Sequence, residues 1–239
     1  MEKEALKELL REIKSNNYEV PEGVRPFELA LEMMNCLGDT DGELRDILAY
    51  SVLQSWMIDD VLSINETHEL LNISLDEKHL LYGLEGADET VFMRAFSALI
   101  VAVAVYKHRS NKYLSKKEIS SILDKVIKFY DEDKDIRGYI EGQGWAHGAA
   151  HGADALDELA RCEEVGYEDL KRILDAIHKK INIGYYGYIH EEDERMITAV
   201  SAILERKLVP ESEMIGWVKS FEKIEKIGQY PHDVLSILM

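Results

Sequence analysis

Two histidines and an aspartate at helical spacing are the residues of this sequence that could perform chemistry together. His147, His151 and Asp154 are separated by four and three positions, and at about 100° per residue their side chains would share one face of an α-helix. Two imidazoles at positions i and i+4 can hold one divalent metal ion, with the carboxylate as a third ligand. The same residues could instead act as metal-free catalytic acid and base groups, with Asp154 orienting an imidazole.

A purely structural role is the alternative to both chemistries. Histidine and aspartate on a helix of small residues can also hydrogen-bond across a helix interface. Gly148 occupies the position where the helices of zinc proteases carry their catalytic glutamate. The sequence alone therefore leaves three possibilities open: a divalent metal ion as cofactor, a metal-free ligand or acid/base site, and a packing network.

Small residues surround the two histidines. Gly144, Gly148 and Gly152 recur every four residues, although each glycine inside a helix costs about 1 kcal/mol relative to alanine. Alanines fill much of the remaining sequence in this segment. A surface this small predicts that another group approaches the segment closely, and that group is either a neighbouring helix or a ligand.

A second polar cluster lies at residues 185–195, which hold three tyrosines, one histidine and four acidic residues. Carboxylates in the first turn of a helix complement the positive end of its dipole, so a helix start explains part of this composition. We also expect a side chain of this cluster to face the His147 helix and complete its site. The residues concerned are His190, Glu192 and Asp193, and Trp145 and Tyr188 are the expected pocket walls.

Helices must position these residues, because helix-period patterns fill the chain. No proline interrupts residues 27–209, and apolar residues recur at helical spacing in four clear segments. These segments are residues 43–56, 119–129, 169–181 and 195–208. Residues 185–189 are the only strand candidate, and they are too few to build a sheet. The sequence therefore predicts an all-α fold.

Helix starts and one core helix can also be predicted. Ser74 with Glu77, and Ser115 with Glu118, have the spacing of capping boxes, and Pro26 and Pro210 suit a first helical turn. The apolar run at residues 96–106 is shorter than the about 20 residues that a membrane span needs. We expect it to form a buried core helix.

A weak internal repeat points to the architecture. An arginine followed four residues later by alanine starts at Arg45, Arg94 and Arg195, and His147 falls between the last two, which gives a spacing near 50 residues. A period of this size, with two helices in each, predicts stacked helical hairpins. We expect a single all-helical domain over residues 1–239, a HEAT- or armadillo-like superhelix with its repeated core at about 38–205. A globular helical bundle is the alternative.

In such a stack the repeated positions would lie along one face of the molecule. Together with the polar residues around the histidines, they form the set of candidate ligand-binding residues. That set is Arg45, Arg94, Arg137, Glu141, Trp145, Tyr188, Glu192, Asp193 and Arg195.

Composition limits the partners. The chain has 28 Lys and Arg against 46 Asp and Glu, a net charge of −18. An acidic surface repels phosphate backbones and anionic lipid headgroups, so we expect neither a nucleic acid nor a membrane as partner. Cys36 and Cys162 form no disulfide framework and no metal-ligand spacing, which fits a reducing cytoplasm.

Several of these strings together resemble a known family. The segments are 138–142, 144–147, 150–154 and 192–195, with further similarity at 43–50 and 94–99. They resemble the core signature of the domain-of-unknown-function family numbered 2785, over roughly residues 38–205. The resemblance implies a bacterial, helical protein and transfers no activity. Gly148 departs from it, since a larger apolar residue is expected at that position.

Two classes of function follow from the sequence. The first is a small-ligand or metal site on the concave face, with hydrolysis as its candidate reaction and His147, His151 and Asp154 as its catalytic or metal-binding residues. The second is a non-catalytic scaffold that binds another protein, in which the histidines and glycines serve packing alone.

Overall fold

The computed structural model describes residues 1–221 and is predominantly helical, which confirms the all-α prediction. The first half contains α1 (Lys3–Ser15), α2 (Pro26–Cys36), the π-helix η1 (Glu43–Tyr50), α3 (Ser51–Ile58), α4 (Ile64–Ser74) and α5 (Thr90–Asn111). The second half contains α6 (Lys116–Glu132), β1 (Tyr139–Ile140), β2 (Gly144–Trp145), α7 (Gly148–Ala160), α8 (Tyr167–Ile181), α9 (Glu192–Arg206) and α10 (Glu211–Ser220). The π-helix η1 continues directly into α3.

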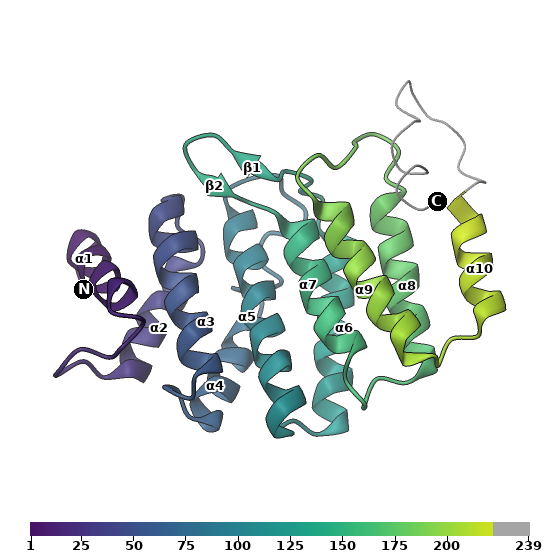
Figure 1. Ribbon diagram of the computed structural model, residues 1–239. Helices are drawn as coiled ribbons and strands as arrows, with labels where there is room; N and C mark the ends of the chain where they lie inside the picture. Colours follow the sequence, from purple (N-terminus) through teal and green to yellow (C-terminus); the bar gives the residue numbers. More distant parts are fainter. Residues whose placement is uncertain (222–239) are drawn as a thin grey trace.

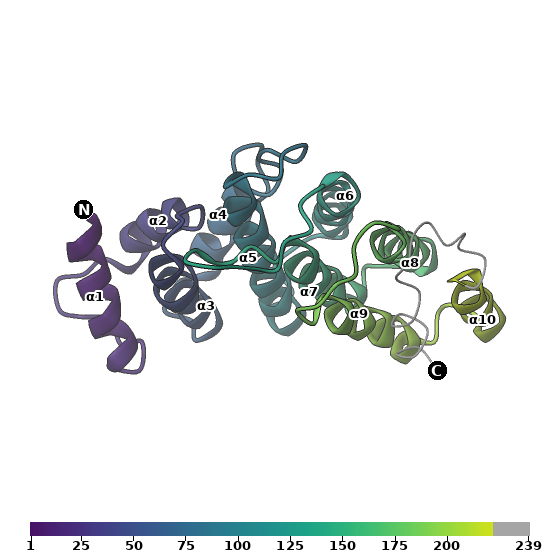
Figure 2. The same ribbon diagram turned by 90° about the horizontal axis from the view of Figure 1, so that it is seen from above.

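The helices form two layers, seen edge-on in Figure 2. Helices α1, α3, α5, α7 and α9 follow one another along the first layer (Figure 1), where α3 contacts α5, α5 contacts α7, and α7 contacts α9. Helices α2, α4, α6 and α8 lie behind them, and α6 contacts α8. Each helix of the first layer therefore meets its neighbours in chain order, and α7 lies between α5 and α9.

Helix α5 is the centre of the packing. Its side chains are buried almost continuously from Val91 to Val105, which confirms the buried core helix predicted at residues 96–106. By length and composition α5 could cross a membrane, but 78% of its apolar window is buried inside the protein. An apolar helix that is buried to this extent is accounted for as core.

One continuous hydrophobic core joins the layers, from Leu6 in α1 to Met214 in α10. The predicted domain extends to residue 239, and residues 222–239 lie outside the described part of the chain. Within residues 1–221, the shared core holds the first-layer helices against one another and so determines which of their side chains face outward together.

The helix starts were predicted with mixed success. Ser115 and Glu118 form a complete capping box at the start of α6, and Pro26 begins α2. The prediction for Ser74 was wrong, because Ser74 is the last residue of α4 and its hydroxyl donates to the Leu70 carbonyl. The capping box of this region is instead Ser63 with Glu66, which starts α4.

A small hairpin joins α6 to α7 and was missed by the sequence patterns. Tyr139 pairs with Trp145 and Ile140 with Gly144 in an antiparallel register. Two-residue strands are too short to produce an alternating pattern, and the signal that could have found them is the pair of turn glycines, Gly142 and Gly144, at positive φ. The strand candidate at residues 185–189 is irregular coil.

Candidate functional site

His147 ends the hairpin connection and starts α7. It is the N-cap residue of α7, with a left-handed backbone (φ 54°), rather than a residue within the helix. The His147 carbonyl accepts the first helical hydrogen bond, from the His151 amide at 3.0 Å. The two imidazole rings lie 5.4 Å apart between centroids, edge to face. The spacing of the histidines therefore brings their rings together, although only His151 belongs to the helix itself.

The second polar cluster does face His147. His147 Nε2 lies 2.8 Å from the His190 carbonyl oxygen and 3.7 Å from Glu192 Oε1. Trp145 stacks on the His147 ring, with centroids 4.6 Å apart and an interplanar angle of 21°. Burial lowers the pKa of His147, which favours the neutral ring in this enclosure. Asp193 is partly exposed and makes no hydrogen bond or ion pair within residues 1–221.

His151 lies one turn deeper in the seam between α5 and α7. Its ring packs edge-on against Phe96 of α5, with centroids 5.1 Å apart. Its Nδ1 atom is buried and finds no hydrogen-bond partner among the described residues. Burial, joined by the nearby His147 and Arg195, lowers the pKa of His151 well below the usual value. At neutral pH His151 is therefore an uncharged imidazole.

Asp154 is paired with an arginine rather than with a histidine. Arg195 Nη1 of α9 donates to Asp154 Oδ1 at 2.9 Å. Burial raises the pKa of Asp154, and the Arg195 charge acts against that rise. Within residues 1–221 no group of three or more His, Cys, Asp or Glu side chains is arranged to hold a metal ion. The trio therefore splits into a histidine pair and an ion pair, and this arrangement lends the metal interpretation no support.

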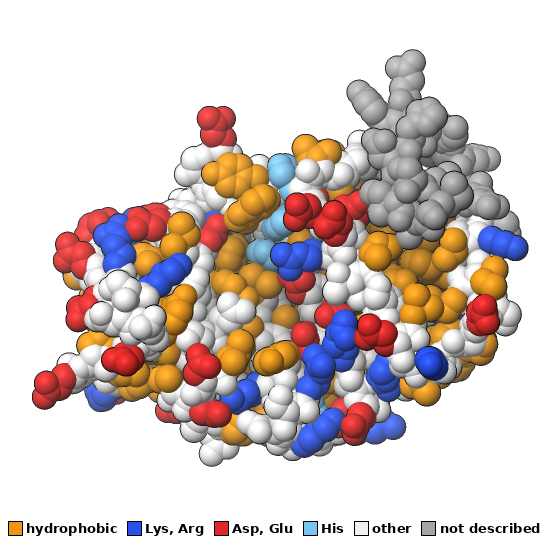
Figure 3. Space-filling model, viewed as in Figure 1, with side chains coloured by type: hydrophobic (Ala, Val, Ile, Leu, Met, Phe, Trp, Pro, Cys, Tyr) orange, Lys and Arg blue, Asp and Glu red, His pale blue; other side chains and the backbone are white. Residues whose placement is uncertain are grey.

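A groove opens beside His151 and Asp154. It has a volume of about 580 Å³ and runs over α5 between α3 and α7. Its lining is Tyr50, Gln54, Ile58, Leu99, Ala102, Val103, Tyr106, His151, Asp154, Asp157, Glu158 and Arg195. Figure 3 shows histidine side chains at the surface here, with hydrophobic side chains on one side and acidic ones on the other. The volume is within the range of about 300–1,000 Å³ that is usual for small-molecule sites.

Most of these lining residues were missed by the sequence analysis. Tyr50, Gln54 and Ile58 follow one another at a spacing of four, and Asp157 and Glu158 come three and four positions after Asp154. These spacings put each set on one helix face. The sequence contained this pattern, but it could not show which faces of these helices remain exposed beside α5.

The glycines of α7 serve packing against α6 and not the groove. A Cβ atom on Gly148 would lie 2.6 Å from Asp133 Oδ2, and one on Gly152 would lie 2.6 Å from Tyr130 Cδ2. Atoms cannot approach so closely without displacement. Of the two bodies that the sequence allowed, the neighbouring helix is the one that approaches these glycines.

Arg45 is buried behind the hairpin. Its side chain is fully buried, and its guanidinium donates to the carbonyls of Asp39, Gln143 and Trp145 at 2.5, 2.7 and 3.2 Å. The guanidinium lies 4.0 Å from the centre of the Phe92 ring. Arg45 therefore fastens the hairpin to η1. It does not lie on an open face, as the repeat had suggested, because the hairpin covers it.

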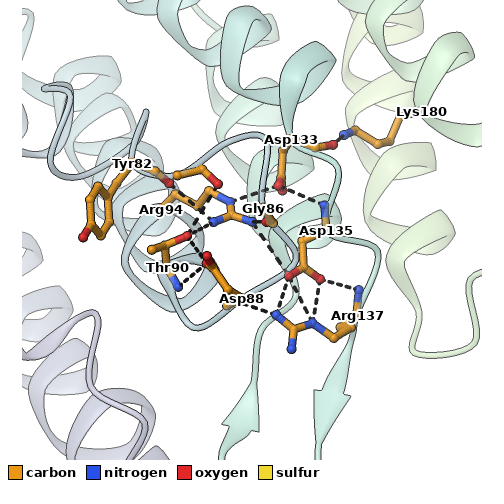
Figure 4. Close-up of polar contacts among 10 residues, drawn as sticks. Tyr82, Gly86, Asp88, Thr90, Arg94, Asp133, Asp135, Arg137 and Lys180 are labelled. Carbon is orange, nitrogen blue, oxygen red and sulfur yellow. Dashed lines mark hydrogen bonds and ion pairs between the residues drawn. The ribbon is translucent and has the colours of Figure 1, made fainter.

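Arg94 is the centre of a second buried network (Figure 4). Its Nε donates to Asp133 Oδ1 at 2.9 Å, and its other nitrogens reach Thr90 Oγ1 at 2.7 Å and the Gly86 carbonyl at 3.0 Å. Both Arg94 and Asp133 have side chains that are essentially inaccessible to solvent. The expected position of Arg94 on an open face is therefore also wrong, since protein groups occupy its hydrogen-bond donors.

The remaining predicted residues lie at the edge of the site. Arg137 pairs with Asp135 in the same network, and this carboxylate raises the pKa of Arg137 (Figure 4). Glu141 is exposed in the hairpin turn. Tyr188 donates to the Lys180 carbonyl at 3.2 Å and so ties the loop before α9 to α8. Of the nine candidate ligand-binding residues, Arg195 is the one that lines the groove.

These observations describe the kind of protein this is: it is predominantly helical and has an open groove beside an uncharged histidine. The chain belongs to the protein family of unknown function DUF2785, whose model matches residues 80–237. This range contains His147, His151, Asp154 and Arg195, whereas Tyr50 lies outside it. No curated protein and no solved structure matches the chain. The family agrees with the resemblance seen in the sequence and assigns no activity.

Proposed function

We propose that this protein binds a small molecule in the groove between α3, α5 and α7. The observation that carries the proposal is the groove itself, since the helices around it are otherwise closely packed. Two polar side chains of its lining each have an atom without an internal partner. Within residues 1–221 the Tyr50 hydroxyl makes no hydrogen bond and the buried Nδ1 atom of His151 has no hydrogen-bond partner, and both residues line the groove. Buried polar groups normally have a partner, and a bound ligand supplies one.

The architecture supports this use. We infer that the stacked helix pairs form a HEAT- or armadillo-like superhelix, because Arg45, Arg94, His147 and Arg195 start or belong to successive first-layer helices. Such stacks present a continuous concave surface made of one helix from each pair. The groove lies on the surface formed by these first-layer helices, at the place where α5 is flanked by α3 and α7.

Metal-free hydrolysis is a second candidate, favoured by one observation. The uncharged His151 imidazole in the groove lining has a nitrogen lone pair that can accept a proton from a water molecule, but its lowered pKa makes it a weaker base than an ordinary histidine. Asp154 does not orient this imidazole, because Arg195 holds its carboxylate. Binding is therefore the primary proposal, and turnover would be an additional property of the same groove.

A screen with a groove-blocked variant tests the proposal. A fragment library is screened by ligand-observed NMR against the wild type, Gln54→Trp and Lys117→Trp. Gln54 lines the groove, whereas Lys117 is exposed on α6. The two variants therefore introduce the same side chain at different positions. We expect fragments that bind the wild type and Lys117→Trp but not Gln54→Trp. If every bound fragment persists in Gln54→Trp, the groove is not the binding site and the proposal fails.

A further inference from the structure

We infer that the groove selects a cation, namely an ammonium or guanidinium group carried on an apolar body. This inference rests on the proposed function, because it names the ligand class of the same groove. Three observations carry it: the charges of the lining, the carboxylate oxygens that remain free, and the apolar floor between them.

Carboxylates outnumber cationic side chains in the lining of the groove. Its lining contains three carboxylates from α7, those of Asp154, Asp157 and Glu158, and a single cationic side chain, Arg195. Arg161 and Arg109 bind two of these carboxylates from outside the groove. The surface that a ligand meets is therefore acidic along one wall, and a cationic group on the ligand is complementary to it.

Two carboxylates keep an acceptor oxygen for a ligand. Arg195 reaches Asp154 Oδ1 at 2.9 Å, and Arg109 reaches Glu158 Oε2. Within residues 1–221 neither Asp154 Oδ2 nor Glu158 Oε1 accepts a hydrogen bond, and neither is a buried unsatisfied atom. Asp157 differs, because Arg161 Nε contacts both of its oxygens at 3.0 and 3.2 Å. The free acceptors therefore belong to Asp154 and Glu158.

The same two carboxylates gain most from a cation. Burial raises the pKa of Asp154 and of Glu158 despite their arginine partners, which means that their ionised forms are incompletely stabilised. An ammonium group that donates to a free oxygen stabilises the ionised form. The neutral His151 beside them adds no opposing charge at neutral pH.

The rest of the groove requires an apolar body on the ligand. Leu99, Ala102 and Val103 are buried residues of α5 that form its floor. Tyr50 and Tyr106 add aromatic side chains to the lining, and aromatic faces attract organic cations. A small inorganic cation would leave this surface uncovered. The net charge of −18 favours the approach of a cation over long range as well.

A matched set of three probes tests the charge. The probes are 4-phenylbutylamine, 4-phenylbutan-1-ol and 4-phenylbutyrate, which share an apolar body and differ in their terminal group. Their dissociation constants are measured by NMR titration against the wild type. We expect the amine to bind at least tenfold more tightly than the alcohol, and the carboxylate to bind most weakly. A dipeptide, N-acetyl-leucyl-lysinamide, tests whether the groove also binds the ammonium group of a lysine side chain.

Variants then locate the cation. Asp154→Asn is expected to weaken the amine about tenfold and to leave the alcohol unchanged. Glu205→Gln is the control, because Glu205 is an exposed acid that binds Arg161 outside the groove. If the alcohol or the carboxylate binds as tightly as the amine, and Gln54→Trp abolishes that binding, the inference fails while the groove remains a binding site. If no probe or fragment depends on the groove, the proposed function fails with it.

Discussion

The two faces of α7 meet similar ion pairs, but one face packs against α6 and the other borders the groove. Toward α6, Gly148 contacts Asp133, which is paired with Arg94, and both of these charged side chains are closed off from solvent. Toward the groove, Asp154 is paired with Arg195, which is 52% exposed. The first pair is enclosed by protein, so that even Asp133 Oδ2, which accepts no hydrogen bond within residues 1–221, is out of reach of solvent, whereas the second pair borders the groove. Exposure to solvent, rather than residue type, separates the packing face from the face available to a ligand.

The largest effect is expected at the buried pair. Arg94→Ala leaves Asp133 buried without its partner, and removal of one member of a buried ion pair costs about 3–5 kcal/mol. The free energy of unfolding, measured by urea denaturation, should fall by that amount. A loss below about 1 kcal/mol would mean that the two faces do not differ as described.

A smaller but clear loss is expected from Gly152→Ala. The new methyl group would overlap the Tyr130 ring, and overpacking of this kind costs about 1–3 kcal/mol. Gly216→Ala is the matched control, since Gly216 also lies within a helix and a Cβ atom there meets no atom within 4 Å. That control should be stabilised by up to about 1 kcal/mol. Equal effects at the two glycines, measured by urea denaturation, would contradict the close approach of α6.

A pH-dependent effect of about 1 kcal/mol is expected from His151. Its folded pKa is lowered by burial, so the unfolded chain takes up a proton below about pH 6.5 and the folded protein does not. Stability is therefore full above that pH and is lost as the pH falls. The loss between pH 7 and pH 5.5 should be about 1 kcal/mol larger in the wild type than in His151→Gln.

The comparison of the two proteins isolates this histidine. Asp154 and Glu158 have raised pKa values and act in the opposite direction at lower pH, but they are present in both proteins and cancel in the difference. Parallel pH profiles of the unfolding free energy would show that His151 is solvated like a surface histidine.

The smallest effect is expected at the exposed pair. Arg195→Ala should lower the free energy of unfolding by less than about 1 kcal/mol, because exposed ion pairs contribute little. Urea denaturation alongside Arg94→Ala gives the comparison directly. A loss as large as that of Arg94→Ala would place Arg195 in the packing and remove it from the groove.

Much of the local structure could be predicted, and the errors have particular causes. The capping box at Ser115 depends on four consecutive residues and was correct, whereas Ser74 has the same spacing and ends a helix. The difference lies in the chain around Ser74, which continues the preceding turn of α4 and is followed by no helix before α5. A local pattern therefore states what a segment can do, and its neighbours select among the possibilities.

The site was predicted only in part, because local patterns do not show which distant segments lie beside it. His147, His151, His190 and Glu192 were expected to meet, and they do. The pairing of Asp154 with Arg195 crosses from α7 to α9, and Tyr50 reaches the groove from η1. Neither contact has a local signal, because each depends on how distant helices are placed beside one another.

The sequence by itself determined the helices, the buried character of α5, the acidic charge and the proximity of the two histidines, since all of these follow from spacing and composition. Only the tertiary structure decided that Arg45 and Arg94 are buried while the similarly placed Arg195 borders a groove. The physical reason is coverage: the hairpin and the end of α6 close over the first two arginines, and the groove beside α5 is left open at the third.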